Sequence, residues 1–157
     1  MSIIYKENMM DFYGFYTGKI FDAYKYLGAH VEEKGVTFRT FAPSASRITL
    51  IGEFNDWQEW EMNKVSDGNF WECYVPQAKA GQMYKYKIYD RNSNPVDHCD
   101  PYGFGMELRP SSASIIRDMS KYKFKDSQWL QNRSDCRKKP LNIYEIHFGS
   151  FRKPSDK

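Results

Sequence analysis

Cysteine is scarce in this sequence, and the few that occur lack the spacing of a metal site. Three cysteines, Cys73, Cys99 and Cys136, occur in 157 residues, and no two of them form a CxxC pair. An odd number of widely separated cysteines fits neither a disulfide framework nor a zinc site. We therefore expect a protein of a reducing compartment, the cytoplasm, without a bound metal.

Three further absences narrow the class of protein. No apolar stretch reaches the length of a membrane span, and no basic segment followed by an apolar run marks a signal peptide at the N-terminus. The net charge of +3 is spread along the chain, whereas a dedicated nucleic-acid binder usually has a dense basic cluster. The motifs GxSxG and HExxH and a Gly-rich phosphate loop are also missing. The residues alone therefore indicate a binding module and show no catalytic constellation.

Aromatic residues, in contrast, are abundant. They make up 17% of the chain, with 12 Tyr, 11 Phe and 4 Trp. Such a composition favours a β-rich fold and leaves aromatic side chains over for a binding face.

Alternation of apolar and polar residues predicts an antiparallel β-sandwich. In YKYKIYD, Tyr84, Tyr86 and Ile88 are expected to face the core. Lys85, Lys87 and Tyr89 then share the outer, solvated face. Short strands separated by turn residues are typical of such a sandwich. The other expected strands are GVTFRTFAP, RITLIG and FWECYVP, with SASIIRD as a possible edge strand.

The two ends of the chain differ from this β-rich middle. A short helix is expected from about Lys19 to Leu27, ended by Gly28. The polar and basic residues 120–140 look like a linker. The run PLNIYEIHFGSF then alternates again and predicts a strand that begins a new unit, so we expect this sequence to be the front of a longer protein. The exposed apolar residues of that strand would promote self-association.

The stretch IGEFNDWQEW places two tryptophans in an expected loop. Trp57 follows the turn signal Asn55-Asp56 and should lie at the tip. One interpretation is that Trp57 and Trp60 cap the open edge of the sandwich and are mostly buried. The other is a stacking platform for a sugar or a base, with neighbouring amides and carboxylates bonding the hydroxyls and Lys85 donating from the adjacent strand.

The order of several motifs carries a family resemblance. The chain from about Asp11 to Arg152 resembles the N-terminal region of bacterial 1,4-alpha-glucan (glycogen) branching enzymes. GxFNxW alone also occurs in isoamylases, trehalohydrolases and the glycogen-binding module of AMP-activated protein kinase, whereas LGAH, ELRPSSAS and HFGSF favour a branching enzyme. The resemblance rests on YKYLGAH, GVTFRTFAPSASRITLIGEFNDW, FWECYVP, GQMYKYKIYD, DPYG, ELRPSSASII and PLNIYEIHFGSF.

This resemblance implies a mainly β fold in four parts. Residues 1–29 would be a helical lead-in and 30–118 an immunoglobulin-like β-sandwich of the carbohydrate-binding module family 48 type. Residues 119–140 would be a linker and 141–157 the first strand of a (β/α)₈ barrel whose remainder is missing.

The parent protein, by resemblance, would cut α-1,4 glucan chains and rejoin them through α-1,6 links in glycogen biosynthesis. The catalytic carboxylates would lie on later barrel strands, so this chain should be inactive, and no metal or organic cofactor is implied. Glycogen and α-1,4-glucan chains would be its partners, together with the barrel in cis, and nucleic acid and membranes would not.

The same resemblance assigns sugar stacking to Trp57 and hydrogen bonding to Lys85. Asn55, Trp60 and Tyr89 are further candidates, with Trp60 expected to pack mainly on the module or the barrel. The kinase module has a second tryptophan where this chain reads DRNSNPVDH, so we expect a Kd on the order of 0.1 to several mM.

Two other functions are open. In one, the sandwich stabilises the barrel and sets chain-length specificity without binding glucan. In the other, the basic and aromatic KYKYKIY face stacks nucleic-acid bases.

Overall fold

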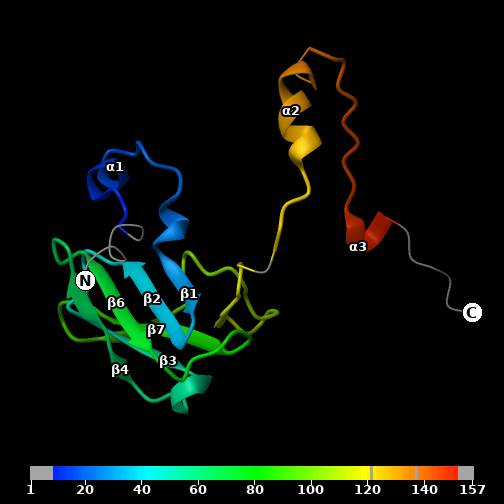
Figure 1. Ribbon diagram of the computed structural model, residues 1–157. Helices are drawn as coiled ribbons and strands as arrows, with labels where there is room; N and C mark the ends of the chain where they lie inside the picture. Colours follow the sequence, from blue (N-terminus) through cyan, green and yellow to red (C-terminus); the bar gives the residue numbers. More distant parts are fainter. Residues whose placement is uncertain (1–8, 121, 137, 152–157) are drawn as a thin grey trace, which may run out of the picture. The chain divides into compact units, whose positions relative to one another are not determined.

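The computed structural model describes residues 9–120, 122–136 and 138–151, and the chain divides into two compact units after Met119. The first unit is built of two layers of strands (Figure 1). Its elements are α1 (Phe12–Tyr16), η1 (Ala23–Lys25), β1 (Gly28–Glu32), β2 (Gly35–Phe41), β3 (Arg47–Gly52), η2 (Glu53–Asn55), β4 (Trp60–Glu61), β5 (Asn63–Val65), β6 (Phe70–Val75), β7 (Met83–Tyr89), β8 (Pro95–His98) and β9 (Ser114–Ile115). The second unit holds α2 (Ser127–Cys136) and α3 (Phe148–Phe151).

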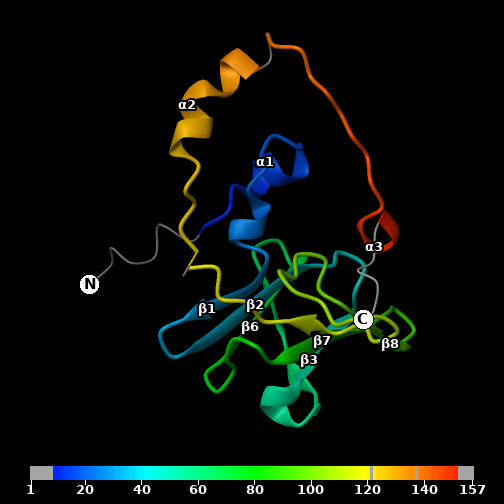
Figure 2. The ribbon, with the colours of Figure 1, turned by 90° about the vertical axis from the view of Figure 1, so that its right-hand side faces the viewer.

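The strands form two antiparallel sheets. Sheet A has the order β1-β2-β6-β5, and sheet B has the order β4-β3-β7-β8, with β9 also pairing with β7. The two sheets face each other in the sandwich (Figure 2). The mainly β, immunoglobulin-like fold expected from the sequence is therefore confirmed, as are the main strands β2, β3, β6 and β7.

The core lies between the sheets and follows the alternation of the strands. Tyr84 and Tyr86 of β7 are fully buried with Ile48 and Leu50 of β3 and Phe38 of β2. The Tyr84 ring meets Phe38 edge-on at 4.9 Å between ring centroids. Lys85, Lys87 and Tyr89, which alternate with the core residues of β7, are only partly buried. The predicted division of this strand into two faces is therefore confirmed.

A buried carboxylate organises one end of this core. Asp100 Oδ2 accepts hydrogen bonds from the hydroxyls of Tyr84 at 2.7 Å and Tyr86 at 3.1 Å. Its Oδ1 accepts from the backbone N–H of Tyr102 at 2.8 Å, and its own N–H donates to Ser114 Oγ at 2.8 Å. Burial raises the pKa of Asp100, against the opposing effect of the Tyr84 hydrogen bond. The Asp100 side chain thus joins β7 to the DPYG turn, and its backbone N–H adds a link to β9.

The lead-in differs from the helix expected over Lys19–Leu27. The structure places α1 earlier, at Phe12–Tyr16, and only the single turn η1 within the expected range. The Asp11 side chain caps α1 by accepting from the N–H of Gly14 at 2.9 Å. The position of the helix is set by the Asp11 cap and by the packing of Phe12 and Phe15 against the sheet. The spacing of apolar residues near Leu27 carries no information on either, so the predicted position was wrong.

Gly28 begins a strand rather than ending a helix. It starts β1 with a φ of +103°, a conformation that glycine adopts without strain. A Cβ at this position would lie 2.8 Å from the carbonyl oxygen of Tyr102. The glycine therefore serves both the turn of the backbone and its close approach to the DPYG segment.

The second unit also departs from expectation. The segment expected to be a linker contains α2, and the strand expected from the run PLNIYEIHFGSF is not formed, because residues 141–147 have no regular secondary structure and α3 follows. A strand needs a neighbour for its backbone hydrogen bonds, and alternation alone does not supply one. Ile143, Ile146 and Phe148 are exposed, as the sequence predicted.

We expect Tyr84→Phe to destabilise the first unit by about 1.5–3 kcal/mol, because it removes a donor from a buried carboxylate. Urea unfolding measures this effect, with Tyr74→Phe as the control, since the exposed Tyr74 hydroxyl donates to the Lys34 carbonyl at 3.0 Å and to no buried charge within the described residues.

The effect of Tyr84→Phe should depend on pH. The raised pKa of Asp100 means that its ionisation lowers stability as pH rises from about 4 through that raised value. Loss of a donor to the ionised form makes this fall larger, so the difference between variant and wild type should be greater at pH 7 than at pH 4.5. An equal loss at both pH values, or a loss no larger than that of Tyr74→Phe, would contradict this role.

Candidate functional site

The loop between β3 and β4 carries the first of the predicted residues. It leaves the sandwich at the end of β3 (Figure 2), forms η2 and then turns through Asp56 and Trp57. These two residues have φ values of 52° and 58°, in the left-handed region that side-chain-bearing residues rarely occupy. The Trp57 side chain is 41% exposed. The loop therefore presents an indole in a backbone conformation that other interactions must hold.

Asn55 provides the first of these interactions. Its Oδ1 accepts from the N–H of Gly52 at 3.0 Å, and its Nδ2 donates to the carbonyls of Gln58 at 2.6 Å and Leu50 at 3.3 Å. The backbone adds a bond from the Trp57 N–H to the Gly52 carbonyl at 2.9 Å. The Asn55 amide thus closes the loop on itself, which is a positioning task.

Glu59 fixes the other end of the loop to the outer face of sheet B. Its carboxylate accepts from the hydroxyl of Tyr89 at 2.8 Å and from Thr49 at 3.2 Å. It also pairs with Lys87 at 3.4 Å and Arg47 at 3.2 Å. The hydrogen bond from Tyr89 is the main cause that lowers the pKa of Glu59. The segment after Trp57 is therefore held on both β3 and β7.

The strand register shows which predicted residues share a face. Ile51 pairs with Lys85, next to the point where the loop leaves β3, so Lys85 lies at the loop end of the outer face. Tyr89 lies four residues further along β7, about 13 Å away at 3.3 Å per residue. It contacts Glu59 through its hydroxyl and Arg47 through its ring, at 4.6 Å. The structure thus brings Lys85 to the Trp57 loop and leaves Tyr89 at the far end of the strand.

Trp60 lies on the other face of the edge strand. It pairs with Leu50, whose side chain is in the core, whereas its neighbour Glu61 pairs with the outward-facing Thr49. The Trp60 side chain is 36% exposed. Because residues paired directly across strands share a face, Trp60 does not join Lys85 on the outer face.

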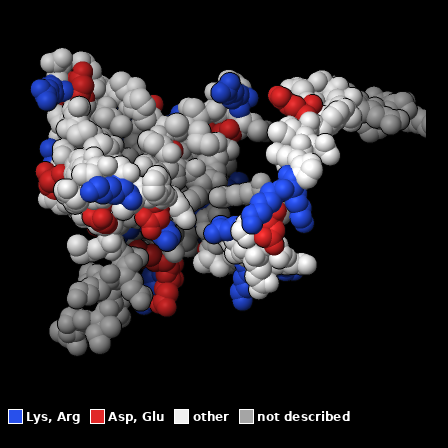
Figure 3. Space-filling view, turned by 90° about the horizontal axis from the view of Figure 1, so that it is seen from above, with Lys and Arg blue, Asp and Glu red and all other residues white. Residues whose placement is uncertain are grey.

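Sequence reasoning counted Glu59 among the polar groups beside Trp57 but did not predict that its carboxylate organises this surface. Glu59 was one of several acidic residues in a loop, and nothing local distinguished it. A signal was present in the alternation of Glu59 and Glu61 with Trp60, which puts both carboxylates on one face. That face also carries Arg47 and Thr49 of the neighbouring strand, so ion pairs and hydrogen bonds to Glu59 could have been predicted. Glu59 and Glu61 balance the positive charges of Lys87 and Arg47. The outer face of sheet B therefore does not form a basic stripe. Figure 3, which views the molecule from above and not onto this face, shows acidic and basic side chains interspersed there as well.

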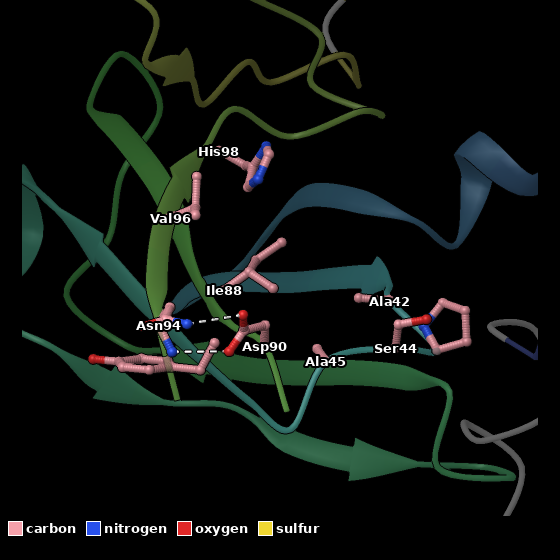
Figure 4. A pocket seen from close by; sticks show the side chains of 10 residues that line it. Ala42, Ser44, Ala45, Ile88, Asp90, Asn94, Val96 and His98 are labelled. Atoms are coloured by element: carbon pink, nitrogen blue, oxygen red, sulfur yellow. Dashed lines mark hydrogen bonds between the residues drawn. The ribbon is translucent and has the colours of Figure 1, made fainter. Parts of the chain in front are cut away.

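A separate cavity of about 290 Å³ lies between the β2–β3 turn and the β7–β8 hairpin (Figure 4). Ala42, Ala45, Ile88 and Val96 give it an apolar wall. At its rim, Asp90 accepts from the N–H of Asn94 at 2.9 Å and from its Nδ2 at 3.2 Å. Those polar groups hold the hairpin turn, and Tyr89 is the one predicted site residue on the wall.

Metal-binding clusters and membrane-spanning helices are both absent within residues 9–120, 122–136 and 138–151. This part of the chain contains no group of three or more His, Cys, Asp or Glu side chains placed to hold an ion. Its helices are too short or too polar to cross a lipid bilayer.

Comparison with known proteins assigns the β-sandwich to a family. Residues 26–103 match Carbohydrate-binding module 48 (Isoamylase N-terminal domain). The 1,4-alpha-glucan branching enzyme GlgB of Fusobacterium nucleatum subsp. nucleatum is 38% identical over 157 residues, with 98% of this chain and 26% of that protein covered. GlgB of Geobacillus stearothermophilus is 37% identical over 155 residues, with 94% and 24% covered. The chain thus spans about a quarter of the length of these relatives.

Solved structures agree on the fold. The ligand-free pullulanase PulA of Klebsiella pneumoniae matches with a TM-score of 0.53 and 24% identity, over 67% of this chain and 11% of that one. A pullulanase from Bacillus acidopullulyticus matches with a TM-score of 0.52 and 22% identity, over 66% and 13%. At this identity the likeness concerns the fold alone.

The sandwich and its exposed loop define a carbohydrate-binding module. It belongs to family 48 of these modules, and the chain that contains it is related to the N-terminal region of the 1,4-alpha-glucan branching enzymes.

We expect Asn55→Ala to destabilise the first unit by about 1–3 kcal/mol, because it removes three hydrogen bonds that close the loop. Amide hydrogen exchange should also become faster at Gly52 and Trp57. The control is Gln58→Ala, because the exposed Gln58 amide donates a long bond to the neighbouring Asp56 carbonyl at 3.4 Å. Unchanged exchange at both amides would show that the loop does not depend on Asn55.

Proposed function

We propose that this chain binds α-1,4-glucan chains at the Trp57 loop, as a module of an enzyme that cuts α-1,4 links and forms α-1,6 links in glycogen biosynthesis. The observation that carries the proposal is the partly exposed Trp57 indole, held on a loop that Asn55 and Glu59 fasten at both ends. The family of the module and the named activity of its relatives support the choice of ligand.

The chemistry of the loop suits a sugar. A pyranose ring has an apolar face that stacks on a flat indole, while its rim of hydroxyls needs donors and acceptors. Lys85 lies on the outer face of sheet B, next to the start of the loop, and its ammonium group donates up to three hydrogen bonds. Trp57 is therefore assigned the stacking and Lys85 the hydrogen bonding.

The other predicted residues receive different roles. Asn55 positions the loop through its backbone bonds. Tyr89 supports the loop through Glu59. Trp60 stays a prediction as a direct contact, since it lies on the opposite face of the edge strand. A single stacking platform without a second one close by keeps the expected Kd in the range of about 0.1 to several mM.

Catalysis is assigned to the remainder of the parent protein. Cleavage of a glucosidic bond needs two carboxyl groups set across the sugar, roughly 5–10 Å apart. The proposal places these groups on a barrel in cis, in the cytoplasm. The module then raises the local concentration of glucan chains near that barrel, and many chain ends on one glycogen particle compensate for a weak single site.

We expect Trp57→Ala to weaken binding of maltoheptaose at least tenfold, about 1.4 kcal/mol, because the stacking surface is lost. A calorimetric or NMR titration of the 157-residue chain measures the Kd. Trp129→Ala is the matched control, since Trp129 is an exposed tryptophan of α2 in the second unit.

The outcomes of this titration separate the candidate functions. Saturable binding by the wild type and Trp129→Ala, lost in a folded Trp57→Ala variant, is the expected result. No binding by the wild type up to about 10 mM would overturn the proposal and leave a structural module that stabilises the barrel. Binding that Trp57→Ala retains would place the site elsewhere.

Lys85→Ala should weaken the same binding about three- to tenfold, because one hydrogen-bonding group worth about 0.5–1.5 kcal/mol is removed. Lys79→Ala is the control, since Lys79 is exposed in the turn before β7. An equal, small effect of both substitutions would indicate general charge rather than a contact at Lys85.

A further inference from the structure

The chain between the DPYG turn and the end of β9 folds back on itself as a hairpin, residues 105–115. Met106 pairs with Ser114 across this hairpin, and the N–H of Glu107 donates to the Ala113 carbonyl at 3.0 Å. The Glu107 carboxylate adds a bond from the N–H of Ala113 at 2.8 Å. Backbone and side-chain bonds therefore hold the two arms together, and the hairpin carries its tip on an ordered base.

The tip of the hairpin exposes aliphatic side chains. Leu108 is 91% exposed and Met106 is 47% exposed, and residues 108–112 are exposed throughout. A single leucine on a surface is ordinary, but this one stands beside a second apolar side chain on a backbone that is already held. Aliphatic side chains offer no flat ring to a sugar, whereas ordered apolar anchors are what a protein partner needs. The tip therefore suits a protein surface better than a glucan.

Two arginines flank these anchors. Arg109 follows Leu108 at the tip, and the Arg117 side chain crosses the hairpin at Gly105, where an added Cβ would lie 2.7 Å from its Nε. Within residues 9–120, 122–136 and 138–151, neither guanidinium takes part in an ion pair. Methionine and arginine are both enriched at protein interfaces, and arginine binds carboxylates in a bidentate fork. A surface that receives this tip thus needs an apolar pocket with carboxylates at its rim.

The extent of the two sequence matches indicates where such a surface lies. The match to the carbohydrate-binding module family ends at residue 103, whereas the match to the Fusobacterium nucleatum branching enzyme covers 98% of this chain. The hairpin is therefore shared with the branching enzymes but lies outside the part that matches the module family. This chain covers 26% of that relative, so about three quarters of such an enzyme is available as a partner in cis.

The hairpin lies at the same end of sheet B as the start of the Trp57 loop. Tyr84 of β7 pairs with Ser114 of β9 on one side and with Gly52 of β3 on the other. Two strand spacings of roughly 4.8 Å place Ser114 about 10 Å from Gly52, where the loop begins. A body that holds the hairpin therefore also fixes the position of the loop relative to itself.

We propose that the 105–115 hairpin docks the module onto the remainder of the parent enzyme, with Leu108 and Met106 in an apolar pocket and Arg109 and Arg117 paired with carboxylates at its rim. This rests on the function proposed above only in taking the chain as a module of a longer enzyme, and it does not require glucan binding. Docking then holds the sugar platform at one fixed place beside the enzyme, which the connecting chain alone would not do.

The test is amide hydrogen exchange, read by mass spectrometry, on the full-length parent enzyme and on the 157-residue chain. We expect residues 106–112 to exchange at least about tenfold more slowly in the parent, because docking excludes solvent from the tip. Leu108→Asp in the parent should return these rates to within about twofold of those in the 157-residue chain. In the 157-residue chain the same substitution should leave the urea midpoint unchanged, because Leu108 is exposed there.

Two further variants isolate the chemistry. Val96→Asp places the same charge at an exposed residue of β8 outside the hairpin, and it should leave the protection of residues 106–112 in the parent unchanged. Arg109→Gln combined with Arg117→Gln should reduce that protection about three- to tenfold. Addition of about 0.5 M NaCl should reduce the protection of the wild type more than that of this double variant, because salt screens the ion pairs.

The outcomes separate this proposal from glucan binding. Equal exchange of residues 106–112 in the parent and in the 157-residue chain overturns the docking role, and so does protection that Leu108→Asp retains. A 157-residue chain that dimerises in sedimentation and loses the dimer in Leu108→Asp assigns the hairpin to a second copy, and it also overturns the proposal. Protection in a parent whose isolated module fails to bind maltoheptaose supports docking and overturns the Trp57 site alone.

Discussion

The antiparallel pairing of β3 with β7 is the constraint on which the rest of this module depends. Six residue pairs, from Arg47 with Tyr89 to Gly52 with Tyr84, fix which side chains face inward. A shift of one residue would move Tyr84 and Tyr86 from the core to solvent and would bury Lys85 and Lys87. The same register ends β3 where the Trp57 loop starts, so the core and the candidate site are set by one set of backbone hydrogen bonds.

The sequence predicted those features that depend on alternation. The four main strands and the two faces of β7 followed from a period of two, because half-buried strands must alternate. The features it missed depend on contacts between distant segments. The position of Gly28 is explained by the Tyr102 carbonyl, which lies far along the chain. The unpaired segment 141–147 shows the converse, since a strand-like pattern without a neighbouring strand leaves the backbone irregular.

The candidate site likewise contains one residue that local sequence predicts and others whose roles depend on contacts between distant segments. Trp57 could be predicted as an exposed tip residue because Asn-Asp is a local turn signal. The tasks of Asn55 and Glu59 could not, because each depends on where its side chain ends after folding. Asn55 reaches back to β3, and Glu59 reaches across to Tyr89 of β7. Residue type alone suggested that Asn55 contacts the ligand, whereas its geometry assigns it to the support of the loop.

The left-handed backbone at Asp56 and Trp57 has a consequence for how a ligand meets this surface. Each such residue raises the energy of the fold by about 1–3 kcal/mol, and glycine would avoid much of that strain. Glycine at the tip would, however, free the loop to sample many shapes and would remove the indole. The chain instead keeps side chains at both positions and restrains them with Asn55 and Glu59. The folded state thereby gives up some stability, and in return the orientation of the Trp57 indole is fixed during folding. Little further ordering would remain when the proposed sugar ligand binds.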